Sequence, residues 1–206
     1  DRSADEIDGY DIVVADTAAP AVFGLDDALF ASGRLDNLSS VHAGLVALIG
    51  LDTKLDHITL FVAFDHEEIG SASRSGAGGP FLADLIARIS AGLGGSETDR
   101  MRSVAESWCL SSDAGHAAHP NYPERHDPAN RPRLGGGPLL KINANQRYAT
   151  DGPGAAEWAR ACRQAGVDYQ EFVSNNDMPC GSTIGPITAT RLGIRTIDVG
   201  LPLLSM

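Results

Sequence analysis

The chain has 206 residues, of which 43% are hydrophobic and 21% are charged, a composition typical of a globular protein rather than a disordered one. This length suffices for one hydrophobic core, so we expect a single domain. The net charge of −11 argues against a basic nucleic-acid-binding surface, and no apolar run approaches the roughly 18 residues of a membrane-spanning helix. We therefore expect neither a nucleic-acid partner nor insertion into a membrane.

The first quarter of the chain contains two short apolar runs, residues 10–15 and 29–32, which predict strands. A helix is predicted over residues 38–49, where apolar side chains recur at helical spacing. Asp36 and Asn37 directly precede this helix, a position that suits either an N-cap or a ligand. The residues themselves leave these two roles open.

Residues 58–64 are β-branched and aromatic without polar alternation, which predicts a strand buried on both faces. Asp65, His66, Glu67 and Glu68 follow at its carboxyl end, where ligands bind in open α/β sheets. Adjacent carboxylates repel each other unless a cation or a shared proton offsets the repulsion. A metal ion, with one Glu as ligand and the other as general base, would use both, and a solvated acidic turn is the alternative.

A loop of small residues at 70–79 lacks the spacing of a phosphate-binding loop. It leads into predicted helices at 80–91 and 96–106, the second capped by Ser96 with Asp99.

The next predicted strand, residues 108–112, ends at Asp113. This is the third predicted strand that is followed by acidic residues, after those that lead to Asp36 and to Glu67 with Glu68. His116 and His119 follow, three residues apart. Such a pair can bind one metal ion from a helical turn, but the neighbouring Pro120 disfavours a helix. A role for His116 in orienting a ligand or in contacting substrate is the preferred interpretation.

The remainder alternates strands with helices. A long irregular loop is predicted at 123–137, strands at 138–143, 169–173 and 194–199, and helices at 155–165 and from about 182 to 192. This alternation predicts an α/β sandwich with a largely parallel or mixed sheet. Lys141 lies inside the first of these strands, as either an edge residue that reaches solvent or a functional one.

The three cysteines, Cys109, Cys162 and Cys180, form neither a Cys-x-x-Cys pair nor an even set, which favours a reducing compartment, the cytoplasm. Cys180 could be a nucleophile, although a small buried residue before a helix is the preferred interpretation. The chain starts at Asp1, not at Met, and stops at Met206 directly after an apolar stretch. We therefore expect that residues are missing on both sides.

Several motifs occur in one order over nearly the whole chain. They are Arg-Leu-Asp-Asn at 34–37, Asp-His-Glu-Glu-Ile-Gly-Ser at 65–71, Ser-Asp at 112–113, Gly-His-Ala-Ala-His-Pro-Asn-Tyr at 115–122, Gly-Pro-Leu-Leu-Lys-Ile-Asn at 137–143, Gln-Arg-Tyr-Ala at 146–149, and Asn-Asp-Met-Pro-Cys-Gly-Ser-Thr-Ile-Gly-Pro at 176–186. Together they resemble the aspartyl aminopeptidase family of dinuclear zinc exopeptidases. The resemblance implies a three-layer α/β/α sandwich around a mixed, largely parallel sheet, with two zinc ions in the active site.

The resemblance also implies roles for single residues. Asp36 resembles the ligand that bridges the two zinc ions, Glu68 a ligand of one ion, Asp113 a ligand of the other, and Glu67 the general base. Such a pair of ions can share a hydroxide whose pKa is near neutral, while a general base passes the proton to the leaving amine.

By the same resemblance, His116 and Lys141 are substrate-binding groups, and Tyr148 hydrogen-bonds the developing oxyanion. A cationic Lys141 would suit an acidic N-terminal side chain. The implied function is a zinc aminopeptidase that removes N-terminal Asp or Glu from peptides and assembles into a homo-oligomer. The alternatives are an aminopeptidase for neutral residues on the same scaffold and a non-catalytic α/β interaction module.

The chain departs from the family pattern at both ends. The family supplies one histidine ligand upstream of this region, another just after a Leu-Ser-Met segment, and a dimerisation domain in between, and none is visible here. We therefore expect residues 1–206 to form an incomplete catalytic core, in preference to substitution by His42, His66 or His119.

Overall fold

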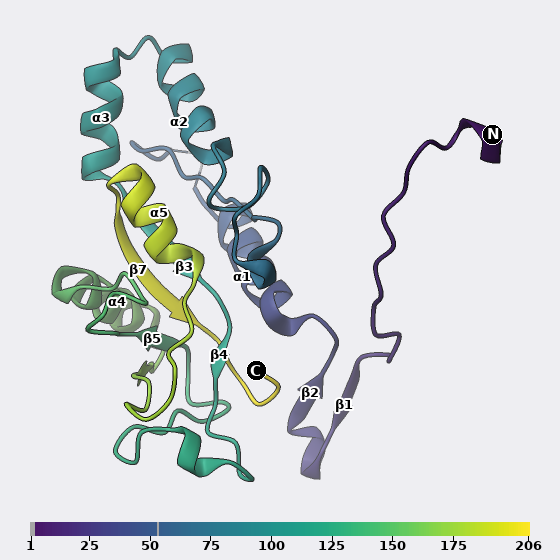
Figure 1. Cartoon of the computed structure of the whole chain (residues 1–206). Helices are drawn as coiled ribbons and strands as arrows, with labels where there is room; N and C mark the ends of the chain where they lie inside the picture. The colour runs from purple at the N-terminus through teal and green to yellow at the C-terminus, as the bar shows by residue number, and fades with distance from the viewer. Residues whose placement is uncertain (1–2, 53) are drawn as a thin grey trace. The chain divides into compact units, whose positions relative to one another are not determined.

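The computed structural model describes residues 3–52 and 54–206, and the chain divides into two compact units, residues 1–35 and 36–206 (Figure 1). Asp1, which entered the expectation of a missing start, lies outside the described residues. Among the helices that are described, none has the length and apolar character needed to cross a bilayer.

The first unit contains a small antiparallel hairpin of β1 (Ala21–Phe23) and β2 (Leu29–Ala31), with 3-10 helices at Ala4–Glu6 and Leu25–Asp27. The strand predicted at 29–32 is therefore confirmed. The strand predicted at 10–15 is wrong, because this segment pairs with no strand in the described part and leaves Val14 97% exposed. Its composition favours an extended backbone, but only a neighbouring backbone makes such a segment a strand.

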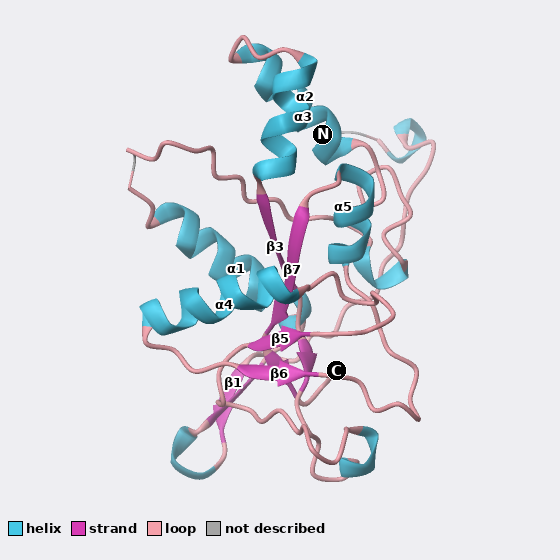
Figure 2. Cartoon of the chain, turned by 90° about the vertical axis from the view of Figure 1, so that its left-hand side faces the viewer, coloured by secondary structure: helices cyan, strands magenta, loops and turns pink. Residues whose placement is uncertain are grey.

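The second unit is built on a four-stranded sheet, drawn in magenta in Figure 2, with the order β3-β7-β5-β6. These strands are β3 (Trp108–Ser112), β5 (Leu139–Lys141), β6 (Gln170–Phe172) and β7 (Arg195–Gly200). The pairs β3–β7 and β5–β6 are parallel, and β5–β7 is antiparallel. The predicted mixed, largely parallel sheet is confirmed. A second parallel pair joins β4 (Gly115–His116) to β8 (Pro202–Leu203).

Alternation along β7 gives the sheet two covered faces. Ile197 and Val199 pack with Leu140 against Trp158 of α4 (Gly152–Ala165). Asp198, which lies between them, faces α5 (Ile184–Leu192) instead. The two helices therefore cover opposite faces, as Figure 2 shows, and the fold is the expected three-layer α/β/α arrangement.

Three further helices are α1 (Leu35–Ile49), α2 (Phe81–Gly92) and α3 (Glu97–Glu106), of which α2 and α3 lie side by side (Figure 1). The predicted capping box is confirmed, because the Ser96 and Asp99 side chains each accept from the other residue's backbone N–H. Gly166 and Gly193 end α4 and α5 in the left-handed conformation. These boundaries agree with the sequence because helix caps depend on neighbouring residues alone.

The strand predicted at residues 58–64 is wrong. This segment belongs to no described strand, and Ile58 is 58% exposed, whereas a strand buried on both faces was expected. The Phe61 ring packs on α1 at Gly44, where an added Cβ atom would overlap it. An apolar run predicts an extended chain, but the pairing that makes a strand comes from segments distant in sequence.

Candidate functional site

Four acidic side chains singled out in the sequence lie near one another, and two of them, Asp36 and Glu67, have raised pKa values. Burial and the carboxylates of Asp113 and Glu68 raise the pKa of Asp36 to about 6. Burial and the carboxylates of Asp113, Glu68 and Asp36 raise the pKa of Glu67 to about 7. Three segments far apart in sequence thus form one carboxylate cluster, which consists of Asp36, Glu67, Glu68 and Asp113.

The two glutamates are presented by a tight turn. Glu67–Ile69 forms a 3-10 helix, and Gly70, at φ +97°, ends it in a conformation that favours glycine. The backbone N–H of Ser71 donates to the carbonyl of His66 (2.9 Å) and so closes the turn. The turn therefore places both glutamates in one short helical segment.

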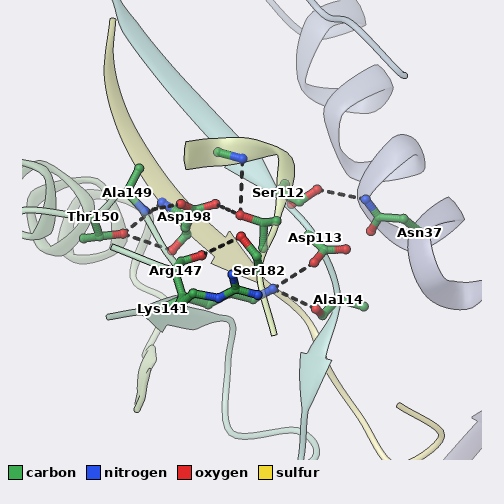
Figure 3. Close-up of polar contacts among 12 residues, drawn as sticks. Asn37, Ser112, Asp113, Ala114, Lys141, Arg147, Ala149, Thr150, Ser182 and Asp198 are labelled. Carbon is green, nitrogen blue, oxygen red and sulfur yellow. Dashed lines mark hydrogen bonds and ion pairs between the residues drawn. The ribbon is translucent and has the colours of Figure 1, made fainter. Parts of the chain in front are cut away.

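Asp36 and Asn37 have non-helical backbone angles at the start of α1. The Asn37 side-chain amide donates to the carbonyl of Ser112 (2.9 Å), which connects this turn to the end of β3 (Figure 3). The Oδ1 atom of Asp36 is buried without a hydrogen-bond partner. An oxygen of this kind carries an uncompensated desolvation cost unless a ligand completes it.

Asp113 lies directly after β3 and is paired with Lys141 (Figure 3). The Lys141 ammonium donates to Asp113 Oδ2 (3.1 Å) and to the carbonyl of Ala114 (2.8 Å). Lys141 is only 2% exposed and lies on β5, an inner strand of the sheet. The interpretation of Lys141 as an edge residue that reaches solvent is therefore wrong.

A cavity of about 620 Å³ lies beside this region and is lined by residues from β4, β6 and the loops that follow β4, β5 and β6. Four of its lining side chains are basic or imidazole groups, and no carboxylate is among the described residues that line it. The four are His116, His119, Arg125 and His126. In a chain with a net charge of −11, this is a local excess of cationic and imidazole groups.

Tyr148 forms part of the cavity wall and is itself 5% exposed. Its ring packs on Phe172 at a centroid distance of 6.0 Å and lies 5.5 Å from the Lys141 Nζ atom. Burial, followed by the neighbouring Cys180, raises the pKa of Tyr148, so the phenol stays protonated at neutral pH. Cys180 packs against the core cluster of Leu139, Tyr148 and Phe172, but it is only partly buried, whereas a small buried residue was the preferred interpretation.

The two histidines of the 115–122 motif have different surroundings. The His116 ring lies in the cavity wall 6.4 Å from both His126 and Phe172, and burial lowers its pKa, which favours the neutral imidazole. His119 accepts from the backbone N–H of Asn121 through Nδ1 (3.1 Å). His126, which the sequence analysis did not single out, is buried and lies in a loop that shows no periodicity.

The carboxylate cluster has the right chemistry for a divalent metal ion. Its donors are carboxylate oxygens, one of them buried and unpaired on Asp36, and a cation would relieve the repulsion that raises the pKa of Asp36 and Glu67. Across residues 3–52 and 54–206, however, no three His, Cys, Asp or Glu side chains converge closely enough to hold an ion unaided. The carboxylates therefore have the right chemistry to bind zinc, but they would supply only some of its ligands.

Comparison with known proteins gives the family of the chain. The sequence model of the aminopeptidase I zinc metalloprotease (M18) family matches residues 2–206. The chain is 55% identical to a probable M18 family aminopeptidase 2 of Streptomyces avermitilis, an alignment that covers 99% of this chain and 48% of the relative. Against a probable M18 family aminopeptidase 2 of Pseudomonas aeruginosa it is 46% identical, over 99% of this chain and 46% of the relative.

Two solved structures share the fold. A cryo-EM structure of the Ape4 and Nbr1 complex is similar at a TM-score of 0.87 and 40% identity, over 93% of this chain and 37% of the other. A structure of the mApe1 dodecamer of S. cerevisiae is similar at a TM-score of 0.78 and 30% identity, over 93% of this chain and 43% of the other. The chain spans about half the length of the curated relatives it matches. Because the family match covers almost every residue, the chain belongs to the aminopeptidase I zinc metalloprotease (M18) family.

Proposed function

We propose that the protein containing this chain is a zinc-dependent aminopeptidase that removes N-terminal residues from peptides. The observation that carries the proposal is the carboxylate cluster in a chain of the M18 family, linked to the wall of the 620 Å³ cavity through Lys141, which pairs with Asp113 and lies 5.5 Å from the Tyr148 ring. A hydrolytic metal site needs a group of acidic ligands beside a space that admits substrate.

We assign Asp36, Glu68 and Asp113 as residues that would hold zinc. When bound, zinc would polarise the scissile carbonyl and supply a hydroxide at neutral pH. Glu67 would be the general base. Its pKa of about 7 supports this role, because a base with a pKa near the working pH can both accept and release a proton.

Tyr148 and His116 are assigned to substrate binding. The protonated Tyr148 phenol is suited to donate a hydrogen bond to an oxygen that becomes negative in the transition state. The neutral His116 imidazole in the cavity wall can donate one hydrogen bond to a substrate carboxylate. Both groups carry hydrogen-bond donors, which a peptidase needs at the acyl oxygen and at the substrate side chain.

We propose that the preferred N-terminal residue is acidic. The lining of the cavity supports this preference, since its ionisable side chains include Arg125 and three histidines but no described carboxylate. Lys141 would add positive potential from its buried position 5.5 Å from the Tyr148 ring. A preference for neutral residues is the competing specificity, and substrate comparison separates the two.

We also propose that residues 1–206 form part of a larger catalytic core, whose remaining ligands, imidazoles included, and dimerisation domain lie elsewhere in the protein. The share of the relatives' length that the chain spans, about half, supports this. The dodecameric S. cerevisiae relative supports assembly into a homo-oligomer. The free thiols of Cys109, Cys162 and Cys180 support a reducing, cytoplasmic setting.

The test is zinc content and peptidase activity of the full-length protein. Elemental mass spectrometry after dialysis at neutral pH should find about two zinc ions per chain, and aspartyl-p-nitroanilide should be cleaved faster than leucyl-p-nitroanilide. Glu67→Gln should lower kcat by roughly 10²- to 10⁴-fold and keep the zinc. Glu106→Gln, an exposed change on α3, is the matched control and should keep both the turnover and the zinc.

Each failure has its own meaning. Zinc without cleavage of either substrate would contradict the aminopeptidase and favour a structural metal in an interaction module. Faster cleavage of the leucyl substrate would overturn only the acidic preference. Absence of zinc from the full-length protein would contradict the assignment of the carboxylate cluster as a metal site.

A further inference from the structure

Asp198 is the most deeply buried ionisable side chain described, with 0% of its surface exposed, and the proposed chemistry does not use it. It lies in the middle of β7, on the face toward α5. Both of its carboxylate oxygens accept hydrogen bonds from uncharged donors. Oδ2 accepts from the backbone N–H of Ala149 (2.6 Å), and Oδ1 accepts from the Thr183 hydroxyl (2.6 Å).

The backbone of Asp198 continues this network (Figure 3). Its N–H donates to the Thr150 hydroxyl oxygen (2.9 Å), and the Thr183 hydroxyl oxygen in turn accepts from the backbone N–H of Gly185 (3.2 Å). A Cβ atom at Gly185 would overlap both Asp198 oxygens, so the carboxylate lies directly against the first turn of α5. One side chain therefore holds two loops that are more than 30 residues apart in sequence.

These two loops also contact each other and form part of the cavity wall. The Arg147 Nε atom donates to the carbonyl of Gly181 (3.2 Å), and the Ser182 hydroxyl donates to the carbonyl of Arg147 (3.0 Å), as Figure 3 shows for the labelled side chains. Tyr148 lies on one loop and Gly181 on the other, and both line the cavity. Tyr148 therefore lies on a loop that these contacts join to the loop of Gly181.

Burying a carboxylate is costly, and an apolar side chain would fill the same space without that cost. A buried carboxylate that is fully hydrogen-bonded does, however, fix the relative positions of its donors more tightly than apolar packing can. We propose that Asp198 is a positioning residue that holds Tyr148 and the adjoining cavity wall in place for substrate. The catalytic consequence rests on the proposed function, whereas the positioning itself does not.

The first measurement needs no catalytic activity. Cys180 is partly buried against the cluster that contains Tyr148 and Phe172, so an increase in its rate of alkylation by iodoacetamide reports opening of this wall. Asp198→Asn, made in the full-length protein, keeps the shape of the side chain but removes one hydrogen-bond acceptor. Peptide mass spectrometry should then find Cys180 alkylated about tenfold faster, because the free energy of one buried hydrogen bond corresponds to about a factor of ten. Cys162, buried on α4, is the internal reference and should keep its rate.

Val104→Ala is the control for general destabilisation, since it removes buried volume on α3. It should lower the melting temperature without raising the Cys180 rate. An unchanged Cys180 rate in Asp198→Asn, or an equal increase in Val104→Ala, would overturn the positioning role.

The second measurement is a double-mutant cycle with Tyr148→Phe. Asp198→Asn alone should lower kcat about tenfold with little change in KM. In a protein that already carries Tyr148→Phe, the same substitution should lower kcat by less than about twofold. Fully additive losses would mean that Asp198 acts elsewhere. If the unmodified protein cleaves no peptide, the proposed function fails, while the alkylation rates still decide the positioning role.

Discussion

Two aspartates, the fully buried Asp198 and the partly buried Asp36, differ in how many of their hydrogen bonds the chain itself supplies. Asp198 is fully buried, and both of its carboxylate oxygens accept hydrogen bonds from the protein. Asp36 keeps one buried oxygen without a partner and lies among other carboxylates that raise its pKa. A carboxylate whose oxygens all accept hydrogen bonds from the protein holds its donors in place, whereas an oxygen without a hydrogen-bond partner is available to a ligand.

The largest effect is expected at the carboxylate cluster. Glu67→Gln should lower kcat by roughly 10²- to 10⁴-fold, because it removes the group that accepts and releases the proton. Zinc content should stay the same, since Glu67 is not assigned as a ligand. Steady-state kinetics with elemental analysis of the same sample checks both expectations, and loss of zinc would make Glu67 a ligand instead.

The same substitution at the two aspartates should act in opposite directions on the metal-free protein. Asp198→Asn should lower stability by about 1–3 kcal/mol, because a buried hydrogen-bonding group loses a partner. Asp36→Asn should raise stability, because it removes a charge from a repulsive cluster. Thermal unfolding of the full-length protein in EDTA measures both, and destabilisation by both changes would erase the proposed distinction.

The pH dependence of stability should expose the cluster as well. The pKa of Glu67 is raised from its ordinary 4.5 to about 7, so protonation favours the folded state. This stabilisation is fully present below about pH 4.5 and is lost as the pH rises through about 7. The metal-free protein should therefore melt at a lower temperature at pH 7.5 than at pH 5.5, and Glu67→Gln should reduce the difference.

The smallest effect is expected from the contact that joins the two acidic segments. Asn37→Ala removes the hydrogen bond to the Ser112 carbonyl and should cost about 0.5–1.5 kcal/mol in chemical unfolding. Val46→Ala, an exposed change further along α1, is the control for the helix itself. A loss of zinc in Asn37→Ala would extend the role of this contact to the spacing of Asp36 and Asp113.

Much of the local structure could be predicted from the residues. The capping box at Ser96 and the glycine ends at Gly166 and Gly193 are confirmed, because each depends on contacts within a few residues. The extended segments 10–15 and 58–64 were predicted as strands and are not, since composition specifies an extended backbone without specifying its partner.

Some residues of the candidate site could likewise be named from the sequence, and others could not. Asp36, Glu67, Glu68 and Asp113 could be named from the sequence, because each follows an apolar run at a point where the chain must turn. By contrast, the role of Asp198 could not be foreseen, since its partners Ala149 and Thr183 are 49 and 15 residues away.

By itself, the sequence determined the family motifs, the acidic residues of the cluster and the alternation of strands and helices, because these are properties of residue types and short spacings. Only the tertiary structure decided that Lys141 is buried against Asp113 and that His126 joins His116 in one cavity wall. It also decided that one Asp36 oxygen lacks a hydrogen-bond partner, whereas both Asp198 oxygens have one. The physical reason is that burial and hydrogen-bond satisfaction depend on which distant segments meet, and a linear pattern does not contain that information.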